Sequence, residues 1–480
     1  MKKNSVVKNY IYNLIYQILI MFLPIVTTPY LSRILGPEMI GIYSYTLSIS
    51  AVFILFGSLG VSLYAQREIA YNQEKKDKCT NIFWEIFILK SITMLISSLV
   101  FYIAFIKMGN MYSYYFTILF FEIIFSIFDI SWFFQGMEDF QKTVFRNIVI
   151  KLISVILIFC FIKVKDDLSK YYLIYVFSIF LNNLSLWFYL PKYLVKTKIS
   201  KLNFVRHLKS IFILFIPQIA IEVYTVLDRT MLGYLILDKS EVGFYDQTQK
   251  VIKLLLSLVT SLGVVMLSRV SSNYSSGNFK KVKDYIYKAF NLVFLLGIPM
   301  VFGIISVSKY FVPVFFGDGY SDVILLMSVL GLIIPIIGIS NVIGVQYSLS
   351  TKRQKIYTTS VIIGAILNFC ANLVLIPIYG AFGACIGTVI AELSVSLYQL
   401  YCIRKDFSII SILKLSKNYF ISSIFMFIIC FLPNLLFNDN LILVISKVIL
   451  GGIIYFIMLF LLKDNLFNDV NNRIFKIVKK

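Results

Sequence analysis

Polar and charged side chains recur at helical spacing inside stretches of this chain that are otherwise apolar. In residues 210–237 an amide, a carboxylate, a hydroxyl and a guanidinium follow one another at intervals of four, three and four residues: Gln218, Glu222, Thr225 and Arg229. This spacing places them on one face of a helix, and Asp228 lies about 100° around it. A guanidinium binds phosphates and carboxylates, and amides and hydroxyls bind sugar hydroxyls. The face therefore indicates an anionic, sugar-bearing ligand.

Other apolar stretches carry similar groups. They are Asp246, Lys250, Lys253, Ser257 and Ser261; Glu122, Ser126 and Asp129; Thr388, Glu392, Ser396 and Gln399; and Asn13 with Gln17. A charge at the centre of a membrane helix costs roughly 2.5–3.5 kcal/mol on insertion scales, so such groups normally face a cavity or a partner. Lys253 has no acidic residue three or four positions away. We therefore expect a hydrated, net-basic cavity.

Each group also has a simpler interpretation, and the sequence leaves both open. Asp246 and Lys250 have the spacing of an ion pair within one helix. Asp228 and Arg229 could form a solvated helix end. Glu122 and Glu392 are typical of hydrogen-bonding groups between packed helices. Acidic groups inside a membrane can also bind a proton or Na⁺, and Asp129, Asp228, Glu222 and Glu392 are candidates for this.

The stretches that hold these groups are long enough to cross a bilayer. Of the 480 residues, 59% are hydrophobic and 14% charged, which is more apolar side chain than a soluble core buries. A spanning helix needs roughly 17–25 residues. The fourteen predicted spans are 10–31, 39–64, 82–106, 112–134, 145–163, 171–190, 210–237, 243–268, 286–307, 322–348, 356–377, 381–403, 418–436 and 440–462. Their continuous apolar runs predict an all-α polytopic membrane protein and disfavour a barrel.

Basic residues fall mainly in every second connection between these spans. If the N-terminus is cytoplasmic, most of the 45 Lys and Arg residues lie on the inside. The positive-inside rule then places both termini in the cytoplasm and the chain in a bacterial inner membrane. The net charge of +21 agrees with contact to anionic lipid. A nucleic-acid partner is disfavoured, because the basic residues are dispersed.

The spans divide into two similar sets. A basic connection at 191–209 separates a first six-helix bundle at 1–190 from a second at 210–405, and residues 406–480 add two helices and a basic tail. Each half opens with a proline-bearing span, Pro24 or Pro217, followed by a G-x-Y sequence at residues 41–43 or 243–245. Two pseudo-symmetric bundles are a common transporter plan.

Signatures of catalysis are missing from the sequence. It contains no G-x-x-x-x-G-K-[ST], G-x-S-x-G or H-E-x-x-H motif. Its six Cys residues have no metal-binding spacing, and its one His, His207, lies in a predicted cytoplasmic connection. We expect neither an enzyme nor a metal or cofactor site. A polysaccharide polymerase is another kind of enzyme with many membrane spans, but it would need a larger outside loop than any that this sequence predicts.

Four motifs follow one another along nearly the whole chain. They are R-I-L-G-P-E with G-I-Y at 33–43; W-F-F-Q-G-M-E at 132–138 with Arg146, Asn147 and Lys151; D-R-T-M-L-G at 228–233 with V-G-F-Y at 242–245 and Lys250; and Asn368, Asn372, Pro377, Gly380, Gly383 and Glu392. In this order they resemble the Wzx-type polysaccharide-unit flippases, of the same superfamily as the lipid II flippase and the MATE exporters.

The resemblance implies alternating access through a cavity between two bundles. The substrate would be an undecaprenyl-pyrophosphate-linked oligosaccharide carried to the outer leaflet for capsule or O-antigen assembly, with a polysaccharide polymerase and a chain-length regulator as further partners. By the match, the phosphate or acidic sugars would be held by Arg33, Arg229, Lys250 and Lys253. From their side-chain chemistry alone, Gln218, Asn13 and Gln17 are candidates to bind the sugar hydroxyls. A MATE-like cation-coupled multidrug exporter is the alternative, although such proteins usually have twelve spans and a more acidic cavity.

Overall fold

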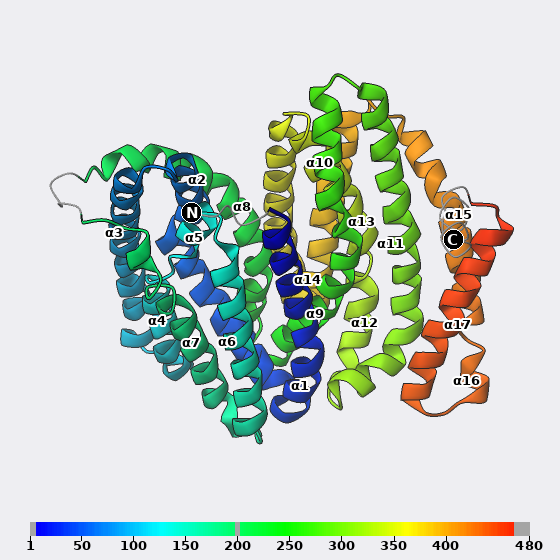
Figure 1. Ribbon diagram of the computed structural model, residues 1–480. Coiled ribbons are helices and arrows are strands. Elements are labelled where there is room, and N and C mark those ends of the chain that lie inside the picture. Colours follow the sequence, from blue (N-terminus) through cyan, green and yellow to red (C-terminus); the bar gives the residue numbers. More distant parts are fainter. Residues whose placement is uncertain (1–5, 197–201, 465–480) are drawn as a thin grey trace. The chain divides into compact units, whose positions relative to one another are not determined.

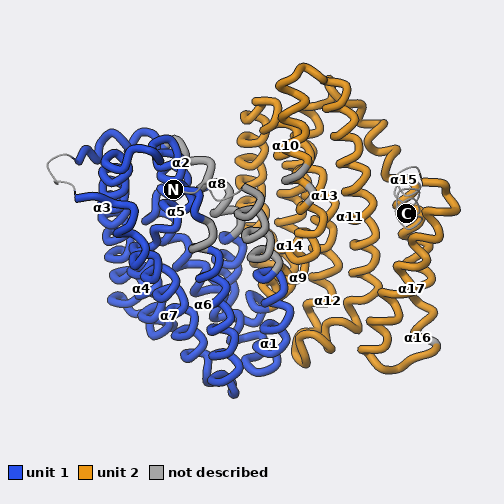
Figure 2. Tube along the Cα trace, viewed as in Figure 1, with its two compact units in different colours: residues 1–243 blue, residues 244–480 orange. Residues whose placement is uncertain are grey.

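The computed structural model describes residues 6–196 and 202–464, with side chains except those of 6–18, 140–143, 213–214, 216–218, 220–225, 262, 264–265 and 435. The described residues form helices joined by short connections, and no strand occurs among them (Figure 1). The chain divides into two units, residues 1–243 and 244–480 (Figure 2). Helices satisfy their own backbone polar groups, which a bilayer requires. The predicted all-α class is confirmed, and the domain limits at 190, 210 and 405 stay predictions.

Nine helical segments of the described residues are long and apolar enough to cross a membrane, so the chain is a multi-pass membrane protein. Gln354–Ile403 contains two of the predicted spans, and Leu19–Ser58 covers parts of two others. Three predicted spans instead correspond to α7 (Leu168–Leu184), α8 (Val205–Leu235) and α9 (Ser240–Thr260). Helix α7 has only 17 residues, and α8 and α9 carry the polar stripes. The count of fourteen spans stays a prediction.

The two longest helices are each broken at a glycine. Helix α1 (Val6–Ser58) leaves helical geometry at Gly36, where φ is 73° and ψ is 172°. Helix α14 (Gln354–Ile403) does so at Gly380, where φ is 56° and ψ is −132°. Glycine adopts such positive φ values without the steric cost of a Cβ atom. Both breaks fall between two predicted spans.

Helix α1 is the centre of the first unit. It contacts α3 (Lys76–Phe101), α4 (Ser113–Ser126), α6 (Phe140–Phe161), α7 and α8. The short helices α2 (Val61–Asn72) and α5 (Ser131–Gly136) pack against each other, and α2 also packs on α3. The W-F-F-Q-G motif forms α5, and its Trp132, Phe133 and Phe134 are fully buried. This motif therefore supplies a packing core.

Helix α11 (Phe279–Phe316) has the corresponding role in the second unit. It contacts α10 (Leu262–Ser275), α12 (Ser321–Leu330), α13 (Ile333–Asn341), α15 (Ile409–Ile429) and α17 (Asn440–Leu461). Lys447, a charged residue of α17, is buried, and its Nζ donates to the Ser306 carbonyl at 3.2 Å and lies 4.3 Å from the Tyr310 ring centroid. The C-terminal helices are thus tied to α11 by a polar contact as well as by apolar packing.

The two G-x-Y sequences meet through their glycines. A Cβ atom at Gly41 would lie 1.6 Å from the carbonyl oxygen of Lys239 and 3.0 Å from the nitrogen of Gly243. A Cβ atom at Gly243 would lie 2.1 Å from the carbonyl oxygen of Pro37. The neighbouring atoms are main-chain atoms, so no side-chain rotation relieves these distances. The motif glycines let α1 and the start of α9 touch through their backbones.

Lys239 holds the connection that forms this contact. Its Nζ donates to the carbonyls of Gly233 at 2.6 Å and Ile236 at 2.7 Å, at the C-terminal end of α8. It also lies 5.2 Å from the Tyr45 ring centroid. Burial lowers the pKa of the Lys239 amine. A cation at this position stabilises the C-terminal carbonyls of a helix.

We expect Gly41→Ala to destabilise the protein by about 1–3 kcal/mol, because the new methyl group must displace main-chain atoms. Gly303→Ala is the control, since nothing lies within 4 Å of a Cβ atom built at this helical position. Thermal unfolding of the purified protein in detergent measures both. Equal unfolding temperatures for the two variants would contradict the close backbone contact.

Candidate functional site

The first unit encloses a cavity of about 410 Å³ that contains Arg229. Helix α1 supplies most of its wall, and α4, α7 and α8 complete it: Leu47, Ser48, Ala51, Ile54, Leu55, Ser58, Glu122, Tyr175, Val226 and Arg229. We call this the Arg229 cavity. It combines a guanidinium, a carboxylate, a phenol and two serine hydroxyls with an aliphatic wall. Such a lining can bind phosphate oxygens and sugar hydroxyls together.

Glu122 organises one side of the Arg229 cavity. Its Oε2 accepts a hydrogen bond from the Ser50 hydroxyl at 2.7 Å, and its Oε1 accepts one from the Tyr175 hydroxyl at 2.9 Å. The residue is only 4% exposed. These bonds join α4 to α1 and α7. They agree with the interpretation of Glu122 as a hydrogen-bonding group between helices.

Helix α8 brings Arg229 to the cavity by packing on the second half of α1. The Thr230 hydroxyl donates to Ser48 Oγ at 2.8 Å. A Cβ atom at Gly233 would lie 2.0 Å from the Tyr45 ring. Asp228, one residue before Arg229, is buried at 2% exposure. The D-R-T-M-L-G motif thus combines a close helix contact with a half-buried guanidinium.

A second cavity of about 200 Å³ lies between α1, α6 and α7 of the same unit. Its lining is Ile20, Leu23, Pro24, Thr27, Lys151, Ser154, Val155, Ile158, Tyr171, Ile174, Tyr175 and Ser178. We call this the Lys151 cavity. Tyr175 lines both cavities. The first unit therefore holds two neighbouring cavities, each with one basic side chain.

The predicted basic residues of α9 lie in the second unit. Lys250 forms an ion pair with Asp246, with Nζ and Oδ2 2.7 Å apart, as the spacing allowed. Its side chain is 40% exposed, so a substrate can still reach the ammonium. Lys253, one turn later, is also exposed. Their role in substrate binding stays a prediction.

Near α9 the second unit contains a neutral polar cluster. The Asn372 amide donates to Asn368 Oδ1 at 3.2 Å, and the Tyr245 and Thr388 hydroxyls are 2.9 Å apart. Gln249 donates to the Tyr245 hydroxyl at 2.7 Å. All five residues are buried. The motif at residues 368–392 thus provides the buried side-chain amides of Asn368 and Asn372.

The remaining predicted residues have separate positions. Arg33 is exposed on α1, and Glu392 is buried in α14 at 9% exposure. Asp129 Oδ1 accepts from the Ser131 backbone N–H at 2.9 Å, and the Asp129 carbonyl accepts from Lys90 Nζ at 2.9 Å. Asp129 therefore shapes the connection between α4 and α5. Its role as an ion-binding group stays a prediction.

Four predicted side chains lie outside the described residues: Asn13, Gln17, Gln218 and Glu222. Most residues that line the two cavities were missing from the predicted site, Tyr175 and Lys151 among them. Lys151 was noted only within a motif, although its charge near the middle of an apolar span was a sufficient signal.

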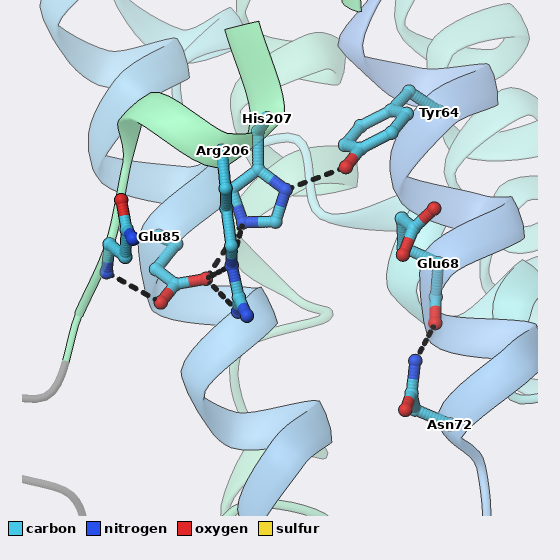
Figure 3. Close-up of polar contacts among 7 residues, drawn as sticks. Tyr64, Glu68, Asn72, Glu85, Arg206 and His207 are labelled. Atoms are coloured by element: carbon cyan, nitrogen blue, oxygen red, sulfur yellow. Dashed lines mark hydrogen bonds and ion pairs between the residues drawn. The ribbon is translucent and has the colours of Figure 1, made fainter. Parts of the chain in front are cut away.

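A separate cluster around Glu85 joins three helices of the first unit (Figure 3). Its carboxylate accepts hydrogen bonds from His207 Nε2 at 2.7 Å, from the Asn203 backbone N–H at 2.7 Å and from the Arg206 guanidinium. On its other side, His207 Nδ1 lies 2.7 Å from the Tyr64 hydroxyl. Glu85 and His207 are 1% and 2% exposed.

The Glu85 cluster contains residue types that also occur in catalytic proton relays. Its polar atoms, however, hold three helices together. Both Glu85 oxygens and both His207 ring nitrogens are already engaged, and their burial leaves no access for a substrate. Within the described residues no group of three His, Cys, Asp or Glu side chains could hold a metal ion. The cluster fixes the start of α8 to α2 and α3.

Comparison with known sequences places this architecture among envelope transport proteins. Residues 6–272 match the family described as polysaccharide biosynthesis protein, and residues 214–374 match the MatE family. A provisionally named O-antigen transporter of Escherichia coli (strain K12) is 25% identical over 418 residues, which cover 84% of this chain and 98% of that protein. The lipid II flippase MurJ of Bacillus subtilis (strain 168) is 24% identical over 159 residues, 33% of this chain and 29% of that protein.

Solved structures share the fold. Lipid II flippase MurJ in an inward closed conformation superposes with a TM-score of 0.75 at 18% identity, covering 96% of this chain and 99% of that one. An inward-facing multidrug resistance MATE transporter gives a TM-score of 0.61 at 14% identity, covering 87% and 97%. The predicted fold class is confirmed by these likenesses. The relatives identified by sequence are transporters and flippases.

We expect Glu85→Ala to destabilise the protein by about 1–3 kcal/mol, because it removes the acceptor of hydrogen bonds from the buried His207 ring and from the Asn203 backbone N–H. Glu68→Ala is the control on α2. Glu68 pairs with Arg67 at 3.7 Å near the surface, an interaction worth about 0–1 kcal/mol. Thermal unfolding in detergent measures both variants. Equal stability of the two variants would show that the Glu85 cluster does not stabilise the contact of α8 with α2 and α3.

Proposed function

The chain belongs to the polysaccharide biosynthesis protein family, and from this premise we propose that it is a flippase for lipid-linked saccharide units. Its substrate would be an undecaprenyl-pyrophosphate-linked oligosaccharide, moved from the inner to the outer leaflet of the cytoplasmic membrane. The product would serve capsule or O-antigen assembly. The names of the two sequence relatives, an O-antigen transporter and a lipid II flippase, support this substrate class.

The observation that carries the proposal is the lining of the Arg229 cavity. Arg229 offers the donors that a phosphate or an acidic sugar needs, and Ser48, Ser58 and Tyr175 surround it with hydroxyls. A polyprenyl tail is soluble in lipid, so only the headgroup needs a polar path. A cavity with one cation and several hydroxyls suits that headgroup.

Further basic groups would act at other stages of transport. We assign Lys250 and Lys253 of α9 and Arg33 of α1 to contacts with the phosphate or acidic sugars, since all three are exposed. The polar side chains of Asn13, Gln17 and Gln218 would bind sugar hydroxyls. Asp228, Glu222, Asp129 and Glu392 are the candidates for binding a coupling ion.

A MATE-like exporter of organic cations is the second candidate, because residues 214–374 match the MatE family. A cation site needs an accessible carboxylate. In the Arg229 cavity both oxygens of Glu122 already accept hydroxyl hydrogen bonds, and the neighbouring charge is a guanidinium. These observations favour the anionic substrate.

Cells that lack this protein should accumulate single lipid-linked saccharide units on the inner leaflet. The measurement compares the accessibility of these lipids to a membrane-impermeant probe in intact and in opened cells. Units stranded on the outer leaflet would indicate a polymerase instead. An unchanged lipid-linked pool would favour the exporter.

Replacing Arg229 by Ala should lower export of saccharide about tenfold or more at unchanged membrane abundance, because a charge-assisted hydrogen bond to the headgroup is lost. Arg229→Lys should retain part of the activity, since it keeps the charge and loses the paired donors. Arg67→Ala, at an exposed position on α2, is the control. Export by Arg229→Ala at the control level would remove Arg229 from the substrate site.

A further inference from the structure

Lys151 occupies an unusual depth in the first unit. Helix α6 (Phe140–Phe161) contains a segment apolar enough to span the membrane, and Lys151 lies eleven residues from the start of the helix and ten from its end. At about 1.5 Å per residue these separations are roughly 16 and 15 Å. Lysines near helix ends extend their ammonium groups to the interface. Lys151 is too far from either end for its side chain to do so completely.

The ammonium group of Lys151 has no ionic or hydrogen-bonding partner among the described residues. Other cations of the predicted spans have one: Lys90 binds the Asp129 carbonyl, Lys447 binds the Ser306 carbonyl, and Lys250 pairs with Asp246. None of the residues that line the Lys151 cavity carries a carboxylate. The Lys151 side chain is exposed. It therefore presents an uncompensated positive charge at the edge of the cavity, at a depth where such a charge is costly.

The lining of the Lys151 cavity has a polar part and an aliphatic part. Hydroxyl groups come from all three helices: Thr27 of α1, Ser154 of α6 and Tyr171, Tyr175 and Ser178 of α7. Aliphatic side chains supply most of the remaining surface: Ile20, Leu23, Val155, Ile158 and Ile174. A cation with hydroxyls beside an aliphatic wall fits an anionic group attached to a hydrocarbon chain.

We propose that the Lys151 cavity binds the phosphate group of a polyprenyl-linked lipid while that lipid crosses the membrane. The proposal rests on the flippase function and adds a phosphate site separate from the Arg229 cavity. Lys151 donates to the phosphate oxygens. The Thr27, Ser154 and Ser178 hydroxyls, which donate to carbonyls of their own helices, become further donors when they rotate toward the phosphate. The aliphatic wall contacts the first units of the chain.

The depth of Lys151 distinguishes two sources of lipid phosphate. The headgroups of bulk phospholipids stay in the interfacial layer, outside a hydrocarbon core about 30 Å thick. Only a lipid in transit brings its phosphate near the middle of this core. The position of Lys151 therefore favours a transported lipid over a resident phospholipid.

Binding to the purified full-length protein in detergent tests this site, with undecaprenyl pyrophosphate as the probe and phosphatidylglycerol as the competing phospholipid. We expect the neutral variants Lys151→Met and Lys151→Gln to bind undecaprenyl pyrophosphate about tenfold more weakly than the wild type. Lys151→Arg should stay within about threefold, because it keeps the charge. Lys107→Met, at an exposed lysine near the end of another span, is the matched control and should bind like the wild type.

Three outcomes would overturn the proposal. Wild-type affinity of both neutral variants removes Lys151 from any lipid site. An equal loss of phosphatidylglycerol binding makes a resident phospholipid the occupant. An equally weak Lys151→Arg variant, with the unfolding temperature of the neutral variants, shows a packing role instead. The flippase function is judged separately: it fails only if cells without the protein keep a normal leaflet distribution of lipid-linked saccharide.

Discussion

A polar group inside a bilayer must find a partner within the protein, and this requirement determines which helices are neighbours here. Glu122 of α4 takes hydroxyl hydrogen bonds from α1 and α7, and Lys90 of α3 reaches the Asp129 carbonyl at the end of α4. In the second unit Lys447 ties α17 to α11. Each bond joins residues at least 39 positions apart in the sequence. Apolar side chains alone would specify these pairings less well, because lipid is as apolar as they are.

The residues of the sequence motifs mainly form contacts between helices. Gly36 breaks α1, and Gly41 and Gly243 bring two backbones into contact. Trp132 and its aromatic neighbours fill the core around α5. Residues of this kind are specific to a fold and carry little information about a ligand. Arg229 and Lys151, for which we propose a role in ligand binding, are single charges that line the two cavities.

Hydropathy alone predicted the helices, because a long apolar segment has few alternatives in a membrane. The spacing of Asp246 and Lys250 correctly allowed their ion pair, and the stripe through Arg229 led to a residue that lines a cavity. The sequence predicted a net-basic cavity but could not predict the lining of the two cavities in the first unit. That lining depends on which side chains α1, α4, α6, α7 and α8 turn toward one another. Tyr175, for example, has the same sequence signature as a tyrosine at the membrane interface.

The acidic residues bear on how such a protein could be driven. Glu122 accepts two hydroxyls, Asp129 caps a connection and Asp246 pairs with Lys250, so each already has a structural role. An anionic headgroup that moves outward follows the inside-negative membrane potential, which supplies about 2.3 kcal/mol per charge per 100 mV. A basic cavity at mid-depth then lowers the barrier without consuming that energy. An anion transporter of this fold would therefore need fewer dedicated carboxylates than a cation exporter, and Asp129, Asp228, Glu222 and Glu392 stay our proposed candidates for any ion coupling beyond the potential.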